Sequence, residues 1–303
     1  MRLAKFTIQP LMAVFLLLMI PISLAAPLDV IAAKPESATD IRYEHANLVL
    51  KHLLKITENQ FGAAEFKEAT EIMSRDRTLA ELIKGENIHI SAEAAKLEWV
   101  RDLTPIYIPI NKGITGYRIF LIAKDSQAEL AKITTLDQLK QLKTGSGTQW
   151  STTKVLRDAG FKVVGTTKLE GLFWMLMGDR FQVLPRGINE APSELASHQT
   201  LFPDMRIEET LAVYIPLPTF FFVSPKHPKL AERIKAGLEM MYADGSFDEI
   251  FYNYHMKMIA DAKLGNRKIF PLANPTLPKE VPLNEARYWF KPGDELEHIK
   301  SSK

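Results

Sequence analysis

Two stiff, proline-containing segments divide this chain, and they limit how it can fold. The first covers residues 102–112 (DLTPIYIPINK) and the second covers residues 215–218 (IPLP). Proline fixes the backbone angle φ and interrupts regular elements, so each segment is predicted to be an extended crossing. Two crossings between two bodies leave the middle of the chain in one body and both ends in the other. We expect lobe 1 to comprise residues 27–114 and 217–303, and lobe 2 to comprise residues 115–216.

Short apolar runs alternate with helical patterns on both sides of the crossings. LDVIAA at residues 28–33 and TFFFV at residues 219–223 are typical of buried strands, while residues 40–61 carry apolar side chains at helical spacing. Strands that alternate with helices favour a parallel sheet with helices on its faces. The predicted fold class is therefore α/β, with a central sheet in each of two lobes and a first lobe that is discontinuous in sequence.

The N-terminus has the features of a secretory signal peptide. Arg2 and Lys5 precede an apolar run over residues 11–24, which contains Pro21 and is followed by Ala25 and Ala26. The run is short for a membrane span, so cleavage near Ala26 is favoured over an uncleaved anchor. We expect residues 1–26 to be removed and the mature protein to be periplasmic. The sequence has no cysteine and therefore offers no site for lipid attachment.

Charge and composition argue against several kinds of partner. Without Arg2 and Lys5, basic and acidic side chains balance at 36 each, so no basic excess points to nucleic acid or anionic lipid. The seven histidines include no pair at i, i+4, and a chain without cysteine has few zinc ligands. We expect no metal and no cofactor, and a monomer.

A glycine-containing loop that leads into a helix is the clearest candidate for ligand contact. Residues 144–160 read TGSGTQWSTTKVLRDAG, with hydroxyl side chains where the helix is expected to begin. Unpaired N–H groups and a partial positive charge at a helix N-terminus favour a carboxylate or phosphate. Thr148, Ser151 and Thr152 are therefore candidate anion contacts; an ordinary capped helix is the alternative. Trp150 is a candidate for stacking on a ligand, although it fits equally well as a packing residue.

Taken in order, several segments resemble the bacterial periplasmic solute-binding proteins of family 3, the amino-acid-type binding proteins of ABC transporters. They include KGITGYRIFLIAK, SGTQWSTTKVLRDAGFKVV and LFWMLMGDRFQVLPRGINEA, and the strongest likeness is in PTFFFVSPKHPKLAERIKAGLEMMYADGSFDEIF. The resemblance covers essentially all of the mature chain. It implies a two-lobed "Venus flytrap" fold, the periplasmic binding protein type II fold, whose cleft closes on a small solute.

The resemblance also suggests ligand contacts on both lobes. Family members commonly place an arginine late in the first lobe to hold the carboxylate of the ligand, and Arg101 is the nearest match here. An exposed arginine paired with Glu98 or Asp102 is an equally good interpretation. Ser91, at the end of a predicted strand, is a further candidate, and a turn residue is the alternative. The helix start at residues 148–152 matches the contact that the second lobe makes in the family.

One position departs from the family pattern. Typical members carry an acidic residue at the end of a strand in the second lobe, where it holds an α-ammonium group, whereas this chain has Arg186 there. A guanidinium would repel an ammonium and suits a carboxylate. Glu190 is close by and either supplies the acidic partner or neutralises Arg186. The departure favours an anionic or polar solute over an ordinary α-amino acid.

Catalytic motifs are either absent or wrongly placed. Residues 151–154 (STTK) and 143–145 (KTG) match two motifs of penicillin-recognising enzymes, but they stand in the wrong order and no S-x-N accompanies them. A dehydratase-like derivative would need an acid or base in the cleft, and Glu190 is the only candidate. We expect no enzyme, but an exported solute-binding protein that serves an ABC permease. A receptor of the same fold that signals to a membrane sensor is the alternative.

Overall fold

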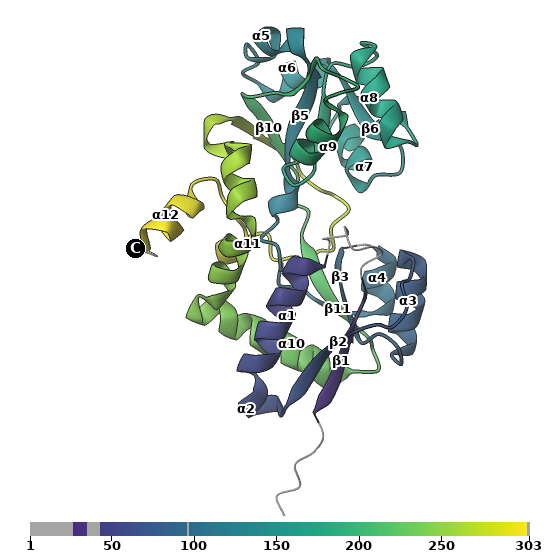
Figure 1. The fold of residues 1–303 in the computed structure, drawn as a ribbon, viewed down its shortest axis with the longest axis vertical. Coiled ribbons are helices and arrows are strands. Elements are labelled where there is room, and N and C mark those ends of the chain that lie inside the picture. Colours follow the sequence, from purple (N-terminus) through teal and green to yellow (C-terminus); the bar gives the residue numbers. More distant parts are fainter. Residues whose placement is uncertain (1–26, 35–42, 96, 302–303) are drawn as a thin grey trace, which may run out of the picture.

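The computed structural model describes residues 27–34, 43–95 and 97–301, which form two lobes joined at a narrow waist (Figure 1). Each lobe has its own sheet, so the expected two-lobed α/β architecture is confirmed. The predicted signal peptide, residues 1–26, lies outside the described residues. No helix in the described ranges is long and apolar enough to cross a membrane.

The sheet of lobe 1 has the strand order β2-β1-β3-β11-β4. Its strands are β1 (Leu28–Ala32), β2 (Ala64–Glu68), β3 (Ile90–Ala94), β4 (Thr104–Ile106) and β11 (Thr219–Val223). Its helices are α1 (Glu44–Ile56), α2 (Glu58–Phe61), α3 (Arg75–Lys84), α4 (Leu97–Asp102) and α10 (Pro228–Asp244). Strands β1, β2 and β3 are parallel as predicted, whereas β11 is antiparallel to both β3 and β4. The sheet is therefore mixed, because β11 enters it from lobe 2.

Lobe 2 contains a sheet of order β12-β10-β5-β8, with β9 also paired to β5, and a two-stranded sheet of β6 and β7. The strands are β5 (Tyr117–Ala123), β6 (Lys143–Gly147), β7 (Lys162–Thr166), β8 (Leu184–Gly187), β9 (Met205–Ile207), β10 (Leu211–Tyr214) and β12 (Lys268–Pro271). The helices are α5 (Gln127–Leu130), α6 (Leu136–Gln141), α7 (Ser151–Asp158), α8 (Leu169–Met177) and α9 (Ala191–His198). The short 3-10 turns η1 (Ile114–Gly116), η2 (Lys124–Ser126), η3 (Leu264–Asn266) and η4 (Ala286–Tyr288) complete the connections.

Strand β5 shows why lobe 2 needs helices on both faces of its sheet. Ile119 and Leu121 belong to one hydrophobic cluster, and Phe120 and Ile122 belong to another. Side chains alternate along a strand, so a continuous apolar run must be covered on both faces. The first cluster includes residues of α8, and the second includes residues of α6 and α7.

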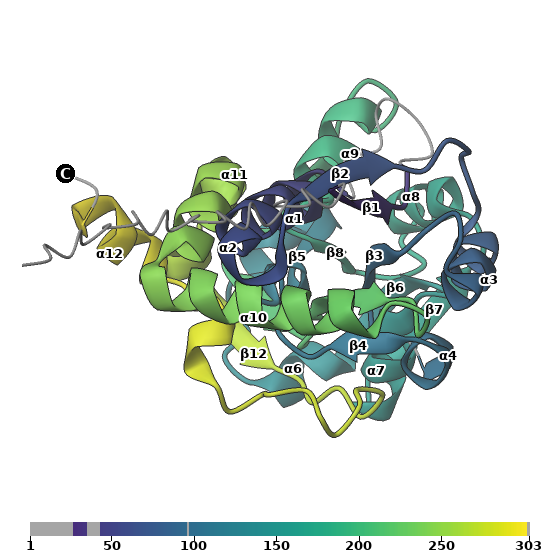
Figure 2. The ribbon, with the colours of Figure 1, turned by 90° about the horizontal axis from the view of Figure 1, so that it is seen from below.

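A third segment also passes between the lobes. Helix α11 (Ser246–Ala262) packs against α1 and α10 in lobe 1 and extends towards lobe 2 (Figures 1 and 2). The chain then forms β12, which pairs in parallel with β10. The predicted assignment of all of residues 217–303 to lobe 1 is therefore wrong for β12. The four residues of β12, KIFP, give no sign in the sequence of which sheet they join.

The segment after β12 returns to the waist and ends with α12 (Asp294–Ser301). The amide of Phe290 donates to the Lys112 carbonyl at 2.9 Å, and the Tyr117 hydroxyl donates to the Phe290 carbonyl at 2.9 Å. The Trp289 ring lies against Gly113, which has a φ of +64°. The predicted extended tail thus wraps over the first crossing and stabilises the hinge.

Candidate functional site

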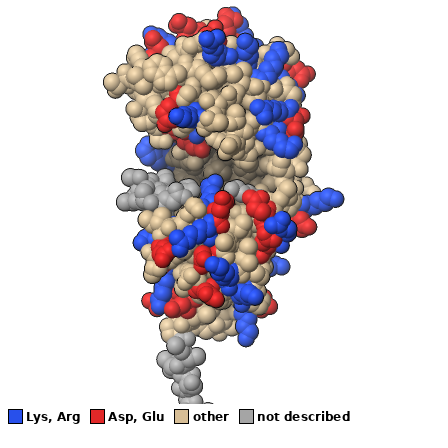
Figure 3. All heavy atoms as spheres, turned by 90° about the vertical axis from the view of Figure 1, so that its right-hand side faces the viewer, with Lys and Arg blue, Asp and Glu red and all other residues tan. Residues whose placement is uncertain are grey.

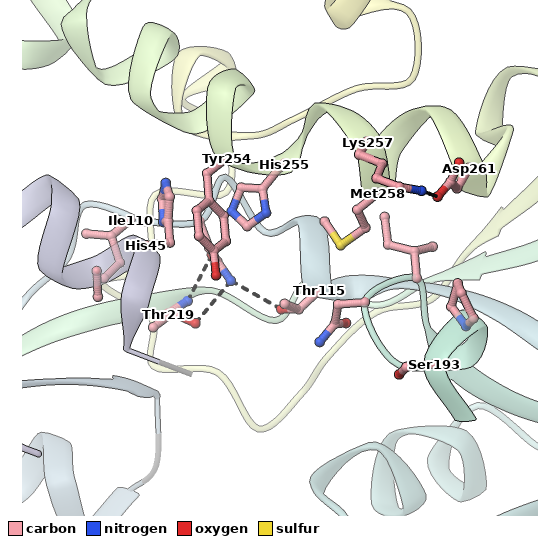
Figure 4. Close-up of a pocket in the computed structure, with 15 residues that line it drawn as sticks. His45, Ile110, Thr115, Ser193, Thr219, Tyr254, His255, Lys257, Met258 and Asp261 are labelled. Carbon is pink, nitrogen blue, oxygen red and sulfur yellow. Dashed lines mark hydrogen bonds and ion pairs between the residues drawn. The ribbon is translucent and has the colours of Figure 1, made fainter. Parts of the chain in front are cut away.

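The main candidate site is a pocket of about 460 Å³ between the lobes (Figure 4). Lobe 1 and the two crossings contribute His45, Ala46, Ile110, Asn111, Thr115 and Thr219; α11 contributes Tyr254, His255, Lys257, Met258 and Asp261; lobe 2 contributes Ile188, Asn189, Pro192 and Ser193. A space-filling view shows a hollow between the two lobes (Figure 3). The pocket volume suits a small organic molecule.

Asn111 fixes the part of the pocket formed by the two crossings. Its amide nitrogen donates to the hydroxyls of Thr115 at 3.2 Å and Thr219 at 3.0 Å. Its amide oxygen accepts from the backbone N–H groups of Gly113 and Thr219, each at 3.1 Å. All four hydrogen bonds are internal, so this side chain holds the crossings together and has little capacity left for a ligand.

Three rings gather where α1 meets α11. The ring centroids of His45 and His255 are 4.6 Å apart, and Tyr254 lies 5.3 Å from His45 and 4.8 Å from His255. Burial lowers the pKa of His45 to about 4. Burial, and then the charge of His45, lower the pKa of His255 to about 3. Both imidazoles are therefore neutral at ordinary pH, and the Nε2 atom of each is buried without a hydrogen-bond partner.

The loop between β8 and α9 forms the lobe 2 wall of the pocket. The Ile188 amide donates to the Tyr117 carbonyl at 3.1 Å, which continues the sheet pairing by one residue. Asn189 and Ser193 are exposed at this wall, and the Ser193 hydroxyl donates to the Glu190 carbonyl at 2.9 Å. The pocket therefore has walls from both lobes.

Arg186 and Glu190 lie beside the pocket in a buried charge network. The Arg186 Nε donates to the Glu194 carboxylate at 2.7 Å and a second guanidinium nitrogen contacts the same carboxylate. Glu190 accepts from Arg118 at 2.7 Å and from the Gly187 amide at 2.8 Å. Burial raises the pKa of Glu190, but the charges of Arg118 and Arg186 and the hydrogen bonds from Gly187 and Arg118 outweigh it, so the pKa is lowered overall.

This network corrects the expectation that Arg186 binds an anionic solute. The Arg186 side chain is 7% exposed and its guanidinium is already paired with Glu194 and Glu190, so two carboxylates balance the charges of Arg118 and Arg186. Glu190 is near Arg186 in the sequence, but the network also needs Glu194 and Arg118, which no local pattern connects to it. Arg186 therefore gives no reason to favour an anion.

Replacing Arg186 by alanine is expected to destabilise the protein by about 2–3 kcal/mol, because Glu194 would be left largely buried without its partner. The free energy of unfolding from urea titration measures this. Arg180→Ala, at an exposed position in the same lobe, should change it by less than about 0.5 kcal/mol. Equal stability of the two variants would show that the network contributes nothing.

The other predicted contacts do not line the pocket. Arg101 is exposed and pairs with Asp102 at 2.6 Å, in agreement with the alternative interpretation of this residue. Ser91 is buried in β3 beside a separate cavity of about 10 Å³, which residues of β1, α1 and β11 also line. Trp150 packs against the Arg186 guanidinium, 4.2 Å from its ring centroid, and against Gly147.

The predicted helix start also differs in detail. Residues 143–147 form strand β6, and Trp150 is the N-cap residue of α7, without a side-chain capping bond. Thr148 and Ser151 are exposed and Thr152 is buried. The Thr153 hydroxyl instead contacts the Gly147 carbonyl and the Ser146 hydroxyl, each at 2.6 Å. The predicted contacts of Thr148, Ser151 and Thr152 with an anion stay predictions.

Sequence patterns point only weakly to the residues that do line the pocket. The spacing of His45 and His52 is typical of a solvated helix face, but α11 covers His45. His255 lies far along the chain in α11, and only the packing of α11 on α1 brings the two histidines together. In the described part of the chain, no group of three or more His, Cys, Asp or Glu side chains could hold a metal ion.

No protein-family model and no curated protein sequence matches the chain. Solved structures similar to it include solute-binding proteins of the type that the sequence resembles. An ancestral arginine-binding protein bound to arginine is 17% identical, covers 76% of this chain and 98% of its own, and has a TM-score of 0.46. An arginine-specific periplasmic binding protein of Salmonella typhimurium is 14% identical, covers 75% and 97%, and has a TM-score of 0.44. A Bacillus subtilis protein is 16% identical, covers 81% and 96%, and has a TM-score of 0.49. Likeness this low says nothing about what this chain binds.

Proposed function

We propose that this chain is an exported solute-binding protein that captures a small solute between its lobes and delivers it to an ABC permease in the membrane. The observation that supports this most directly is the pocket of about 460 Å³, whose walls come from both lobes and from the crossings between them. A solute bound there contacts both lobes at once and therefore favours the closed arrangement over the open one.

The proposed lobe boundaries follow the crossings. Lobe 1 comprises residues 27–114 and most of the chain after residue 217, and lobe 2 comprises residues 115–216 together with β12. The bonds of Asn111 to Thr115 and Thr219 hold the crossings together at the pocket. Closure then occurs by rotation about this fixed point while α11, the third connection, bends or shifts. Function consists of capture and release, without a chemical step.

Thermal-shift measurements with matched variants test the site. We expect at least one solute from a panel of amino acids, organic acids, oligosaccharides and uncharged amides to raise the melting temperature. Occupancy at 100 times Kd adds about 2.7 kcal/mol of stability, which corresponds to a rise of roughly 5 °C or more. Ser193→Trp places an indole in the pocket and should abolish the rise.

Ser197→Trp is the matched control for this experiment. Ser193 and Ser197 are both exposed on α9, and each donates its hydroxyl to a backbone carbonyl three residues earlier, at 2.9 and 3.1 Å. Only Ser193 of this pair lines the pocket. A solute that stabilises the Ser193→Trp variant as much as the parent binds elsewhere, and the proposed site would then be wrong.

A further inference from the structure

The two charged side chains in the described lining of the pocket pair with each other. Lys257 and Asp261, one turn apart on α11, form an ion pair at 2.6 Å. Glu44 precedes the lining residue His45 but does not itself line the pocket, and its carboxylate accepts a hydrogen bond from the Tyr254 hydroxyl at 2.8 Å. His45 and His255 are buried and neutral at ordinary pH. The described lining therefore offers no unpaired charge to a solute.

Most of the remaining lining is apolar. Ala46, Ile110, Ile188, Pro192 and Met258 line the pocket together with the rings of His45, Tyr254 and His255. The buried Nε2 atoms of the two histidines are not accessible from the pocket, so these residues present ring faces and edges. Asn189 is exposed at the lobe 2 wall, where its amide can both donate and accept a hydrogen bond.

We propose that the pocket takes an uncharged solute with an apolar body and one amide-like hydrogen-bonding group, which meets Asn189. This inference rests on the proposed function and specifies its class of solute. A charged group that enters the pocket loses hydration and finds no unpaired counter-charge among the described lining residues, and this penalty is several kcal/mol for a fully buried ion. An apolar body gains from contact with the rings and with Met258.

Three probes of similar size and different charge test this proposal. Benzamide is uncharged, benzoate is an anion and benzylammonium is a cation, and each joins one small polar group to a benzene ring. Titration calorimetry at pH 7.5 on the full mature chain is expected to show saturable benzamide binding, at least tenfold tighter than binding of either ion. Ser193→Trp should weaken benzamide binding at least tenfold, and Ser197→Trp should change it less than twofold.

A second variant tests the charge argument within the same pocket. Asn189→Asp introduces an unpaired carboxylate at the lobe 2 wall, so benzylammonium binding should strengthen and benzamide binding should weaken, each about tenfold. The proposal is overturned if benzoate or benzylammonium binds the parent as tightly as benzamide, or if none of the three binds. In either case the proposed function stands as long as a solute of another class stabilises the parent but not the Ser193→Trp variant.

Discussion

The Gly116→Ala variant is expected to be less stable than the parent by about 4 kcal/mol or more, or to fail to fold. A Cβ atom at this position would lie 2.0 Å from the backbone carbonyl oxygen of Ile215 and 3.2 Å from the ring of Tyr214. The Ile215 amide also donates to the Gly116 carbonyl at 3.0 Å. The two crossings are thus in backbone contact at Gly116, and a methyl group must push them apart.

Gly265→Ala is the control for this prediction, because a Cβ atom at this exposed position would have no other atom within 4 Å. It should change the free energy of unfolding by no more than about 0.5 kcal/mol. Urea unfolding followed by circular dichroism measures both variants. A Gly116→Ala protein as stable as the Gly265→Ala protein would mean that the crossings are not packed as described.

The second large effect is acid destabilisation caused by His45 and His255. Their folded-state pKa values, about 4 and about 3, lie below the unfolded value of 6.5, so the unfolded chain binds more protons between these limits. Stability is therefore complete above pH 6.5 and is lost as the pH falls towards the folded values. At pH 5 each histidine lowers the free energy of unfolding by about 2 kcal/mol relative to pH 7.5, so the pair lowers it by about 4 kcal/mol.

The His255→Phe variant separates the acid destabilisation caused by His255 from that caused by other titratable groups. Phenylalanine keeps a ring beside His45 and Tyr254 but removes one ionisable group and its buried Nε2. The loss of stability between pH 7.5 and pH 5 should fall by about 2 kcal/mol. An unchanged loss would show that His255 is protonated in the folded protein at pH 5.

The fold could be predicted where short sequence patterns specify the same element that the structure contains. The TFFFV and YRIFLIA segments form strands β11 and β5, because an apolar run between breakers is stable only when it is buried on both faces. The prolines around residues 105–109 and 216–218 mark the crossings. By contrast, the sequence did not predict that β12 joins lobe 2 by pairing with β10. Strand pairing depends on contacts between residues far apart in the chain, which the spacing of apolar residues does not reveal.

The site is predicted less well, because it depends on which side chains meet. The sequence offers Glu190 as a possible partner of Arg186, but the carboxylate that binds its guanidinium through two nitrogens is Glu194, in the following helix. The same holds outside the site for Glu208, which is buried beside the exposed Glu209 and accepts hydrogen bonds from the Thr210 and Leu211 amides at 2.8 and 2.6 Å. A single sequence shows the charges but not their partners.

If the pocket between the lobes holds a small solute, native mass spectrometry will detect it directly. The mature chain is incubated with the small-molecule extract of bacterial cells, desalted and sprayed under gentle conditions beside the Ser193→Trp and Ser197→Trp variants. We predict one discrete small adduct on the parent and on Ser197→Trp, and none on Ser193→Trp. The same adduct on all three proteins, or no adduct on any of them, would contradict the claim.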